Sequence, residues 1–292
     1  MADVNTRRWA ALIFAFVLLA ACGGSSSSGD GGQSVVSLAP DGGTIVIGPD
    51  GSSSTVDAPA GGTTPDGGTL PANGGGQPSP SVDSTGPVGS FGHAILSPSV
   101  TGAIELDLRE QDGASPQQPS IDHVTSVLHS ASGKNVATAA SGLDGGARSW
   151  SADDLRALGA AGHAQSSDHA VIHLLFVHGS FGGDTSVLGV SVRGDTAAIF
   201  IDQVRASATP LVGSAGIETA VVTHEVGHLL GLVDLVLHTG RQDPDHPGHS
   251  TNKNSVMYWA VESNVVADLL QGGPPKDFDD ADLADLANIR GG

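Results

Sequence analysis

The 292-residue chain has few cysteines, methionines and basic residues, and each shortage excludes something. Cys22 is the single cysteine, so the chain forms no internal disulfide bond. Lysine and arginine total 12 against 31 aspartate and glutamate residues, which gives a formal net charge of −19. This charge repels phosphate backbones and anionic surfaces, so we expect no nucleic-acid partner. Met1 and Met257 are the only methionines, which makes the position of the second one informative.

The first 22 residues have the layout of a secretory signal peptide. Arg7 and Arg8 precede an apolar run, residues 9–21, that is too short to span a bilayer comfortably. A short transmembrane anchor is the alternative reading. Leu19-Ala20-Ala21-Cys22 resembles a bacterial lipobox, whose cysteine becomes the lipidated first residue of a mature lipoprotein. The resemblance implies export and a lipid anchor at Cys22, on the outer membrane or the surface of the cell envelope.

Residues 23–90 consist mainly of Gly, Ser, Pro, Thr and Asp. Such a segment buries too little apolar surface to offset the loss of chain entropy, so we predict a disordered tether. A coil of this length has a root-mean-square reach of about 45 Å. An inhibitory propeptide is the alternative role for the same segment.

We assign residues 91–292 to one globular domain. The run 171–177 is almost continuously apolar, as expected for a central strand that is covered on both faces. Strands alternate with helices, which predicts an α/β (α+β) fold with a mixed sheet. The predicted strands are 103–109, 135–140, 169–178, 187–192 and 196–201, and the predicted helices are 119–132, 214–230, 278–289 and one that starts at Ser151.

The stretch HEVGHLLGLVD, residues 224–234, carries the main chemical prediction. On a helix, residues four apart lie on the same face, so His224 and His228 can bind one metal ion. Glu225 lies beside them. A zinc ion lowers the pKa of its bound water, and a neighbouring carboxylate accepts the water proton for attack on a carbonyl. Gly231 is expected to end the helix and allow the chain to turn back with a third ligand.

The 224–234 stretch and Met257 together resemble the metzincin clan of zinc metallopeptidases, of the matrixin or archaemetzincin kind. The clan pattern is HExxHxxGxx followed by His or Asp, with a methionine turn further along. The resemblance implies a mixed twisted sheet with an antiparallel edge strand, packed on the active-site helix and a C-terminal helix. It also implies that Zn²⁺ is bound by His224, His228 and Asp234, with Glu225 as general base and Met257 beneath the metal.

The third ligand stays open at this stage. Asp234 matches the clan spacing, but histidine is the commoner zinc donor, and His249 is the main alternative ahead of His238 and His246. If a histidine binds instead, Asp234 is expected to orient that ligand. The same His- and Asp-rich loop is either a site for a second Zn²⁺ or Ca²⁺ ion or a solvated turn.

The sequence therefore predicts an exported, lipid-anchored, monomeric zinc endopeptidase. We expect its protein or peptide substrate to pair with strand 187–192, although the same sequence pattern also fits an edge strand that binds no substrate. Alternatives are a surface-binding lipoprotein that keeps the fold without catalysis, and a hydrolase of cell-wall peptide. The intact Glu225 favours an enzyme.

The other histidines have no motif spacing and are expected in the core or on the surface: His93, His123, His129, His163, His169, His173 and His178.

Overall fold

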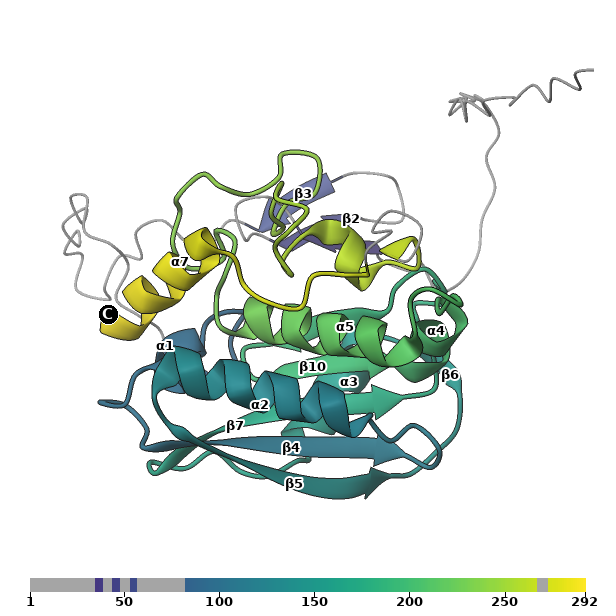
Figure 1. Ribbon diagram of the computed structural model, residues 1–292, viewed down its shortest axis with the longest axis horizontal. Coiled ribbons are helices and arrows are strands. Elements are labelled where there is room, and N and C mark those ends of the chain that lie inside the picture. Colours follow the sequence, from purple (N-terminus) through teal and green to yellow (C-terminus); the bar gives the residue numbers. More distant parts are fainter. Residues whose placement is uncertain (1–34, 39–43, 48–52, 57–81, 267–272) are drawn as a thin grey trace, which may run out of the picture. The chain divides into compact units, whose positions relative to one another are not determined.

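The computed structural model describes residues 35–38, 44–47, 53–56, 82–266 and 273–292 (Figure 1). The predicted signal peptide, Cys22 and most of the predicted tether lie outside the described residues. The chain divides into two compact units. In the N-terminal unit, β1 (Val35–Leu38), β2 (Thr44–Ile47) and β3 (Ser53–Val56) form an antiparallel sheet. Among the helices of the described segments, none has the length and apolarity that a membrane span requires.

The C-terminal unit is built on a five-stranded sheet with the strand order β5-β4-β7-β10-β9. β5, β4, β7 and β10 run parallel, and β9 pairs antiparallel with β10 at one edge. The predicted mixed sheet with an antiparallel edge strand is therefore confirmed. In chain order the strands are β4 (Ala103–Gln111), β5 (Asn135–Leu143), β7 (His169–Val177), β9 (Gly189–Arg193) and β10 (Thr196–Phe200). A separate parallel pair joins β6 (Arg148–Trp150) to β8 (Gly179–Phe181).

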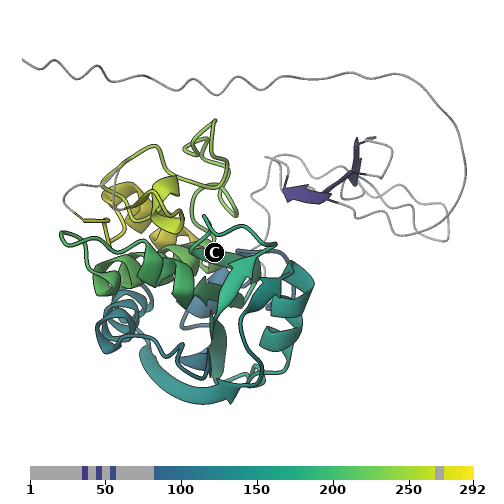
Figure 2. The ribbon, with the colours of Figure 1, turned by 90° about the vertical axis from the view of Figure 1, so that its right-hand side faces the viewer.

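Helices cover both faces of this sheet, because successive side chains of a strand point to opposite sides. α2 (Gln118–Ser132) and α5 (Ser214–Leu229) lie on one face, and α3 (Ala152–Ala160) lies on the other (Figures 1 and 2). Central β7 contributes to both layers: Ile172, Leu174 and Phe176 pack in the core with α2 and α5, and Leu175 and Val177 pack with α3. The predicted central, doubly covered strand is confirmed.

The remaining helices are short or terminal: α1 (Gly92–Leu96), α4 (Ile201–Ala206), the 3₁₀ helix η1 (Trp259–Glu262) and α7 (Asp280–Gly291). The predicted helix start at Ser151 is confirmed. Ser151 and Asp154 form a capping box on α3, and Asp279 caps α7 together with Asp282. The C-terminal helix α7 packs on α1 and α2.

Residues before Phe91 also pack on the C-terminal unit. Gly194 N donates to Gly86 O (2.9 Å), and Val88 contacts the larger core cluster. Gly89 adopts a φ of 86° and leaves room for the turn after α5, where Gly231 lies against it. The packed part of this unit therefore includes the end of the segment for which a tether was predicted.

Candidate metal centre

Helix α5 holds the three predicted motif residues in the interior. Every residue from Ile217 to Leu229 is buried, including His224, Glu225 and His228. A helix that is apolar on all sides belongs in a core, so its polar side chains need partners from other segments. Those partners come from the chain that follows the helix.

Four side chains converge beside α5. One ligand atom from each of His224, His228, His249 and Glu262 lies within 4.8 Å of the others. The Nε2 atoms of His224 and His228 are 3.0 Å apart, and the His249 ring lies 5.2 and 5.1 Å from the two other rings. Glu262 Oε2 lies 3.5 Å from His224 Nε2, and Glu262 Oε1 lies 3.0 Å from His249 Nε2. In the described part of the chain, no second group of this kind is found.

The surroundings act differently on the histidines of the group: burial lowers the pKa of His249, but the contact with Glu262 outweighs this and raises it, whereas the pKa of His228 is lowered. His224 Nδ1 donates to Val256 O at 2.7 Å, so the neutral ring presents an unprotonated Nε2 to the group. Burial, reinforced by the charges of His224 and His249, holds the pKa of His228 well below its usual range. His249 Nε2 is buried and is at ion-pair distance from Glu262, without the geometry of a hydrogen bond. Three imidazoles and a carboxylate are donors that Zn²⁺ accepts, so the residues fit the predicted metal.

Asp234, the preferred third ligand from the sequence, is not a member of this group. Its Oδ1 accepts hydrogen bonds from Thr239 N (2.9 Å) and Thr239 Oγ1 (2.6 Å), and its Oδ2 accepts one from Gln242 N (3.3 Å). The helix does end near Gly231, whose φ is 91°, but the chain then turns the Asp234 carboxylate toward its own loop. His249, the alternative from the sequence, is the third histidine of the group.

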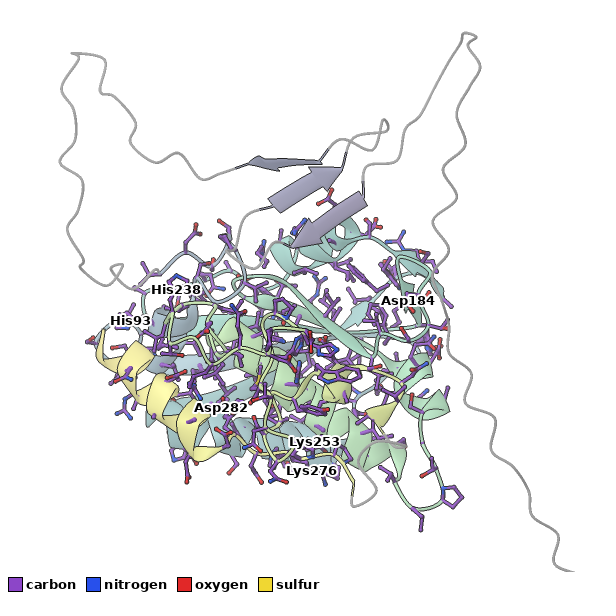
Figure 3. The ribbon with its side chains drawn as sticks, turned by 90° about the horizontal axis from the view of Figure 1, so that it is seen from above. His93, Asp184, His238, Lys253, Lys276 and Asp282 are labelled. Atoms are coloured by element: carbon purple, nitrogen blue, oxygen red, sulfur yellow. The ribbon has the colours of Figure 1, made fainter. Side chains whose placement is uncertain are left out.

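The loop that carries His249 is fastened at both ends. Arg241 forms an ion pair with Asp285 of α7 and donates to Ala281 O. Ser250 N donates to Met257 O at 2.8 Å, which joins the loop to the predicted methionine turn. His238 is exposed and lies on the same left-hand side of Figure 3 as His93, away from Asp184 on the right. Because the contacts of Arg241 and Ser250 hold the loop between them in place, His249 lies against α5, whereas His238 precedes this segment.

Glu225 lies beside the group and against the edge strand β9. Its Oε2 accepts a hydrogen bond from Ser191 Oγ (2.8 Å), and its Oε1 finds no hydrogen-bond partner among the described residues. Burial raises the pKa of Glu225 well above its usual range, and the charge of Glu262 adds to this rise. A Cβ on Gly189 would lie 2.6 Å from Glu225 Oε1, so the glycine makes room for the carboxylate. This carboxyl group is placed to hold a proton beside the three imidazoles.

Glu262 was not anticipated from the sequence. It ends η1, five residues after Met257, and no motif or periodicity singles it out. Burial raises its pKa, but the contacts with His224 and His249 outweigh this and hold the pKa of Glu262 well below its usual range. The two carboxyl groups at the site are therefore unequal, with Glu262 favouring the charged form and Glu225 the neutral form.

Comparison with known proteins gives fold likeness only. No protein-family model matches the chain. No curated protein matches it by sequence. An archaemetzincin structure from Methanopyrus kandleri is similar at 19% identity and a TM-score of 0.44, over 64% of this chain and 96% of that one. An archaemetzincin from Archaeoglobus fulgidus, complexed with malonate, is similar at 18% identity and a TM-score of 0.38, over 62% and 99%. The functional conclusion therefore depends on the geometry of the site.

A pocket of about 360 Å³ opens beside the metal-ligand group. His249 and Glu262 belong to its lining, and His246 stacks flat on Trp259 with the rings 4.3 Å apart. Trp259 is thus part of the pocket wall. The apolar lining side chains are Phe181, Val187, Val190, Pro247 and Trp259.

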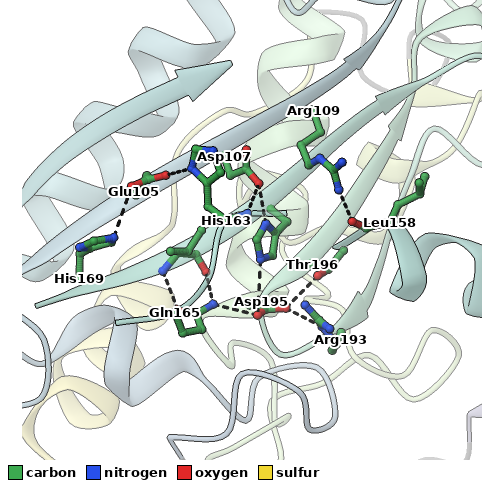
Figure 4. A network of polar contacts seen from close by, with 12 residues as sticks. Glu105, Asp107, Arg109, Leu158, His163, Gln165, His169, Arg193, Asp195 and Thr196 are labelled. Atoms are coloured by element: carbon green, nitrogen blue, oxygen red, sulfur yellow. Dashed lines mark hydrogen bonds and ion pairs between the residues drawn. The ribbon is translucent and has the colours of Figure 1, made fainter. Parts of the chain in front are cut away.

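A second polar cluster lies on the other face of the sheet (Figure 4). His173 Nδ1 is 2.9 Å from Asp107 Oδ2, and its Nε2 is 3.9 Å from Asp195 Oδ2. All three side chains are at most 2% exposed. Gln165 donates to Asp195 Oδ2 at 2.9 Å, and His163 N donates to Asp107 Oδ2 at 3.0 Å. His173 is thus a core histidine with partners, in line with the expectation for histidines outside the motif.

Proposed function

We propose that this protein is a zinc-dependent endopeptidase in which His224, His228 and His249 bind the metal and Glu225 transfers the proton. The observation that carries the proposal is that three imidazoles converge beside the Glu225 carboxyl group, one oxygen of which has no hydrogen-bond partner among the described residues. His249 replaces Asp234 in the ligand set, because the Asp234 carboxylate is already bonded to its own loop. The proposal includes one ion, since the described residues contain one such group.

Zinc, when bound, would polarise the substrate carbonyl and lower the pKa of a coordinated water. Glu225 supplies the proton transfer. Ser191 Oγ holds its Oε2, which leaves Oε1 as the atom that accepts the water proton and later donates it to the leaving nitrogen. Burial raises the pKa of Glu225, which lets the carboxyl group keep this proton until the leaving nitrogen takes it.

The substrate is proposed to be an extended peptide that pairs with the free edge of β9. β9 has a strand neighbour on one side only, β10, so its other edge can accept main-chain hydrogen bonds. The apolar pocket beside Trp259 would receive one side chain of that peptide. Export and anchoring through Cys22 are part of the proposal and rest on the lipobox resemblance, which would place the substrate outside the cytoplasm.

The test combines metal analysis with a peptidase assay on the purified protein. We expect one zinc per chain, and a loss of about 10²- to 10⁴-fold in peptide hydrolysis for Glu225→Gln with the zinc retained. Glu218→Gln is the matched control, because Glu218 is buried on the same helix but bonds to Gln117 instead of facing the ligand group. Full activity of Glu225→Gln would contradict the assigned base, and no hydrolysis by the zinc-loaded wild type would favour the non-catalytic surface-binding lipoprotein. Hydrolysis of purified peptidoglycan but not of casein would favour a cell-wall substrate.

A further inference from the structure

We propose that Glu262 is the fourth side-chain ligand of the metal centre, so that the resting centre is closed by the protein itself. The inference rests on the proposed metal site and goes beyond it, because the three histidines and Glu225 already account for the chemistry of hydrolysis. Zinc sites with four protein ligands are closed, whereas catalytic zinc sites keep one position for water or substrate. The role of Glu262 therefore decides which kind of site the resting protein has.

The carboxylate of Glu262 is aimed at the ligand group. Each of its oxygens faces a different imidazole: Oε1 is 3.0 Å from His249 Nε2, and Oε2 is 3.5 Å from His224 Nε2. Carboxylate oxygen is an accepted zinc donor, and with three imidazole nitrogens it completes a set of four. Glu225, the other carboxyl group nearby, is not in this set, and its Oε2 is held by Ser191.

Backbone contacts hold Glu262 in this position. Its carbonyl oxygen accepts a hydrogen bond from Leu188 N (2.8 Å), and Asn264 N donates to Ser186 O (2.8 Å). Between these bonds, Ser263 forms an antiparallel bridge with Val187. The main chain on both sides of the carboxylate is thus paired with the residues that lead into β9. Glu262 does not reach the site as a freely mobile surface side chain.

The same pairing places Glu262 next to the strand that is proposed to bind substrate. Segment 262–264 pairs with residues 186–188, which lead into β9, and β9 itself has one strand neighbour, β10. The resting centre is closed in this proposal, and it opens one coordination position when the Glu262 carboxylate leaves the histidines.

Azide binding to the Co²⁺-substituted protein, followed by visible absorption, tests the closure directly. Azide needs an open coordination position, so we expect it to bind Glu262→Gln about tenfold or more tightly than the wild type. Glu225→Gln is the matched control, since it also removes a carboxylate beside the metal but should leave the position closed. Equal azide affinity in all three proteins would overturn the inference.

Two further readouts keep the inference separate from the proposed function. X-ray absorption of the wild-type zinc protein should show three imidazole ligands and one carboxylate, and it needs no variant that has to fold. A water in place of the carboxylate would overturn the fourth-ligand role while leaving the three-histidine site intact. A wild-type protein that binds neither Zn²⁺ nor Co²⁺ would contradict the proposed function and, with it, this inference.

Discussion

The sulfur of Met257 lies over Gly227, so close that a Cβ on Gly227 would overlap it. Met257 is fully buried, and Phe278 closes the same space from another direction. The glycine inside the motif helix therefore lets the methionine turn pack beneath the histidines. This contact joins two sequence features that are 30 residues apart.

Gly227→Ala should lower the free energy of unfolding by about 1 to 3 kcal/mol, because the added methyl group overpacks the space filled by Met257. Gly216→Ala is the matched control on the same helix. Its Cβ would meet nothing closer than the Lys276 side chain at 3.9 Å, so we expect a gain of up to about 1 kcal/mol from helix propensity. Urea denaturation of both variants measures the difference. Equal effects would show that Met257 can move aside at no cost.

Replacement of His249 and of Asp234 should affect different properties. His249→Ala should weaken zinc binding by about a hundredfold or more, since it removes a ligand. Asp234→Ala should keep the zinc but cost about 1 to 3 kcal/mol of stability, because it leaves Thr239 N and Gln242 N without their acceptor. Chelator competition and thermal melting measure the two effects. Loss of zinc in Asp234→Asn, which keeps an acceptor oxygen, would restore Asp234 as a ligand.

Removal of the metal should destabilise the fold. A ligand that binds only the folded state adds about 2.7 kcal/mol when its free concentration is a hundred times its Kd. We therefore expect the melting temperature to fall in a chelator and to recover when excess zinc is restored. His249→Ala provides the control, because its melting temperature should respond much less to zinc. An unchanged wild-type melting temperature would mean that the four side chains hold no ion.

Lys134 should make stability rise with pH in the alkaline range. Its Nζ is buried, where it donates to Ala94 O and Thr101 Oγ1, and burial followed by the charge of Arg290 lowers its pKa from 10.5 to about 8. Between these two pH values the unfolded chain binds a proton that the folded chain has released, so the free energy of unfolding increases with pH, by about 3 kcal/mol at most.

Lys134→Met should remove this pH dependence. Ala94 O keeps its hydrogen bond from Thr101 Oγ1 (2.8 Å), so the variant leaves no buried acceptor unpaired there. Denaturation of both proteins at pH 7.5, 9 and 10 measures the slope. The pKa values of Lys134 in the unfolded and the folded chain differ by about 2.5 pH units, and pH 9 and 10 lie between them. A wild-type curve parallel to that of Lys134→Met would contradict the prediction.

Asp107 and His173 should be strongly coupled. Burial raises the pKa of Asp107, but the hydrogen bonds from His173 and from the main chain of His163 outweigh this and lower it. His173→Leu removes the side-chain partner and should cost about 3 to 5 kcal/mol, as is common when a buried charge loses its partner. The double variant with Asp107→Leu should recover part of that loss. Additive effects in the double-mutant cycle would show that the two side chains act independently.

Local patterns were enough to predict the mixed sheet and the motif helix, whereas the antiparallel edge strand was implied by the family resemblance. Alternating and continuous apolar runs mark β4 and β7, and Ser151 and Asp279 mark two helix starts by capping chemistry. His224 and His228 share a face because four residues make about one helical turn. These features depend on residues close together in the chain, and a single sequence contains that information.

The rest of the site depends on contacts between distant segments. Spacing favoured Asp234, but a left-handed turn and three hydrogen bonds direct that carboxylate into its own loop, and His249 reaches the helix instead. Glu262 is placed at the site because its main chain pairs with Leu188. Ser191 is placed there by the register of β9 against β10. The sequence by itself determined the helix, the pair of histidines and the neighbouring Glu225. Only the tertiary structure decided which side chains complete the group, because long-range packing and hydrogen bonding leave no period in the sequence.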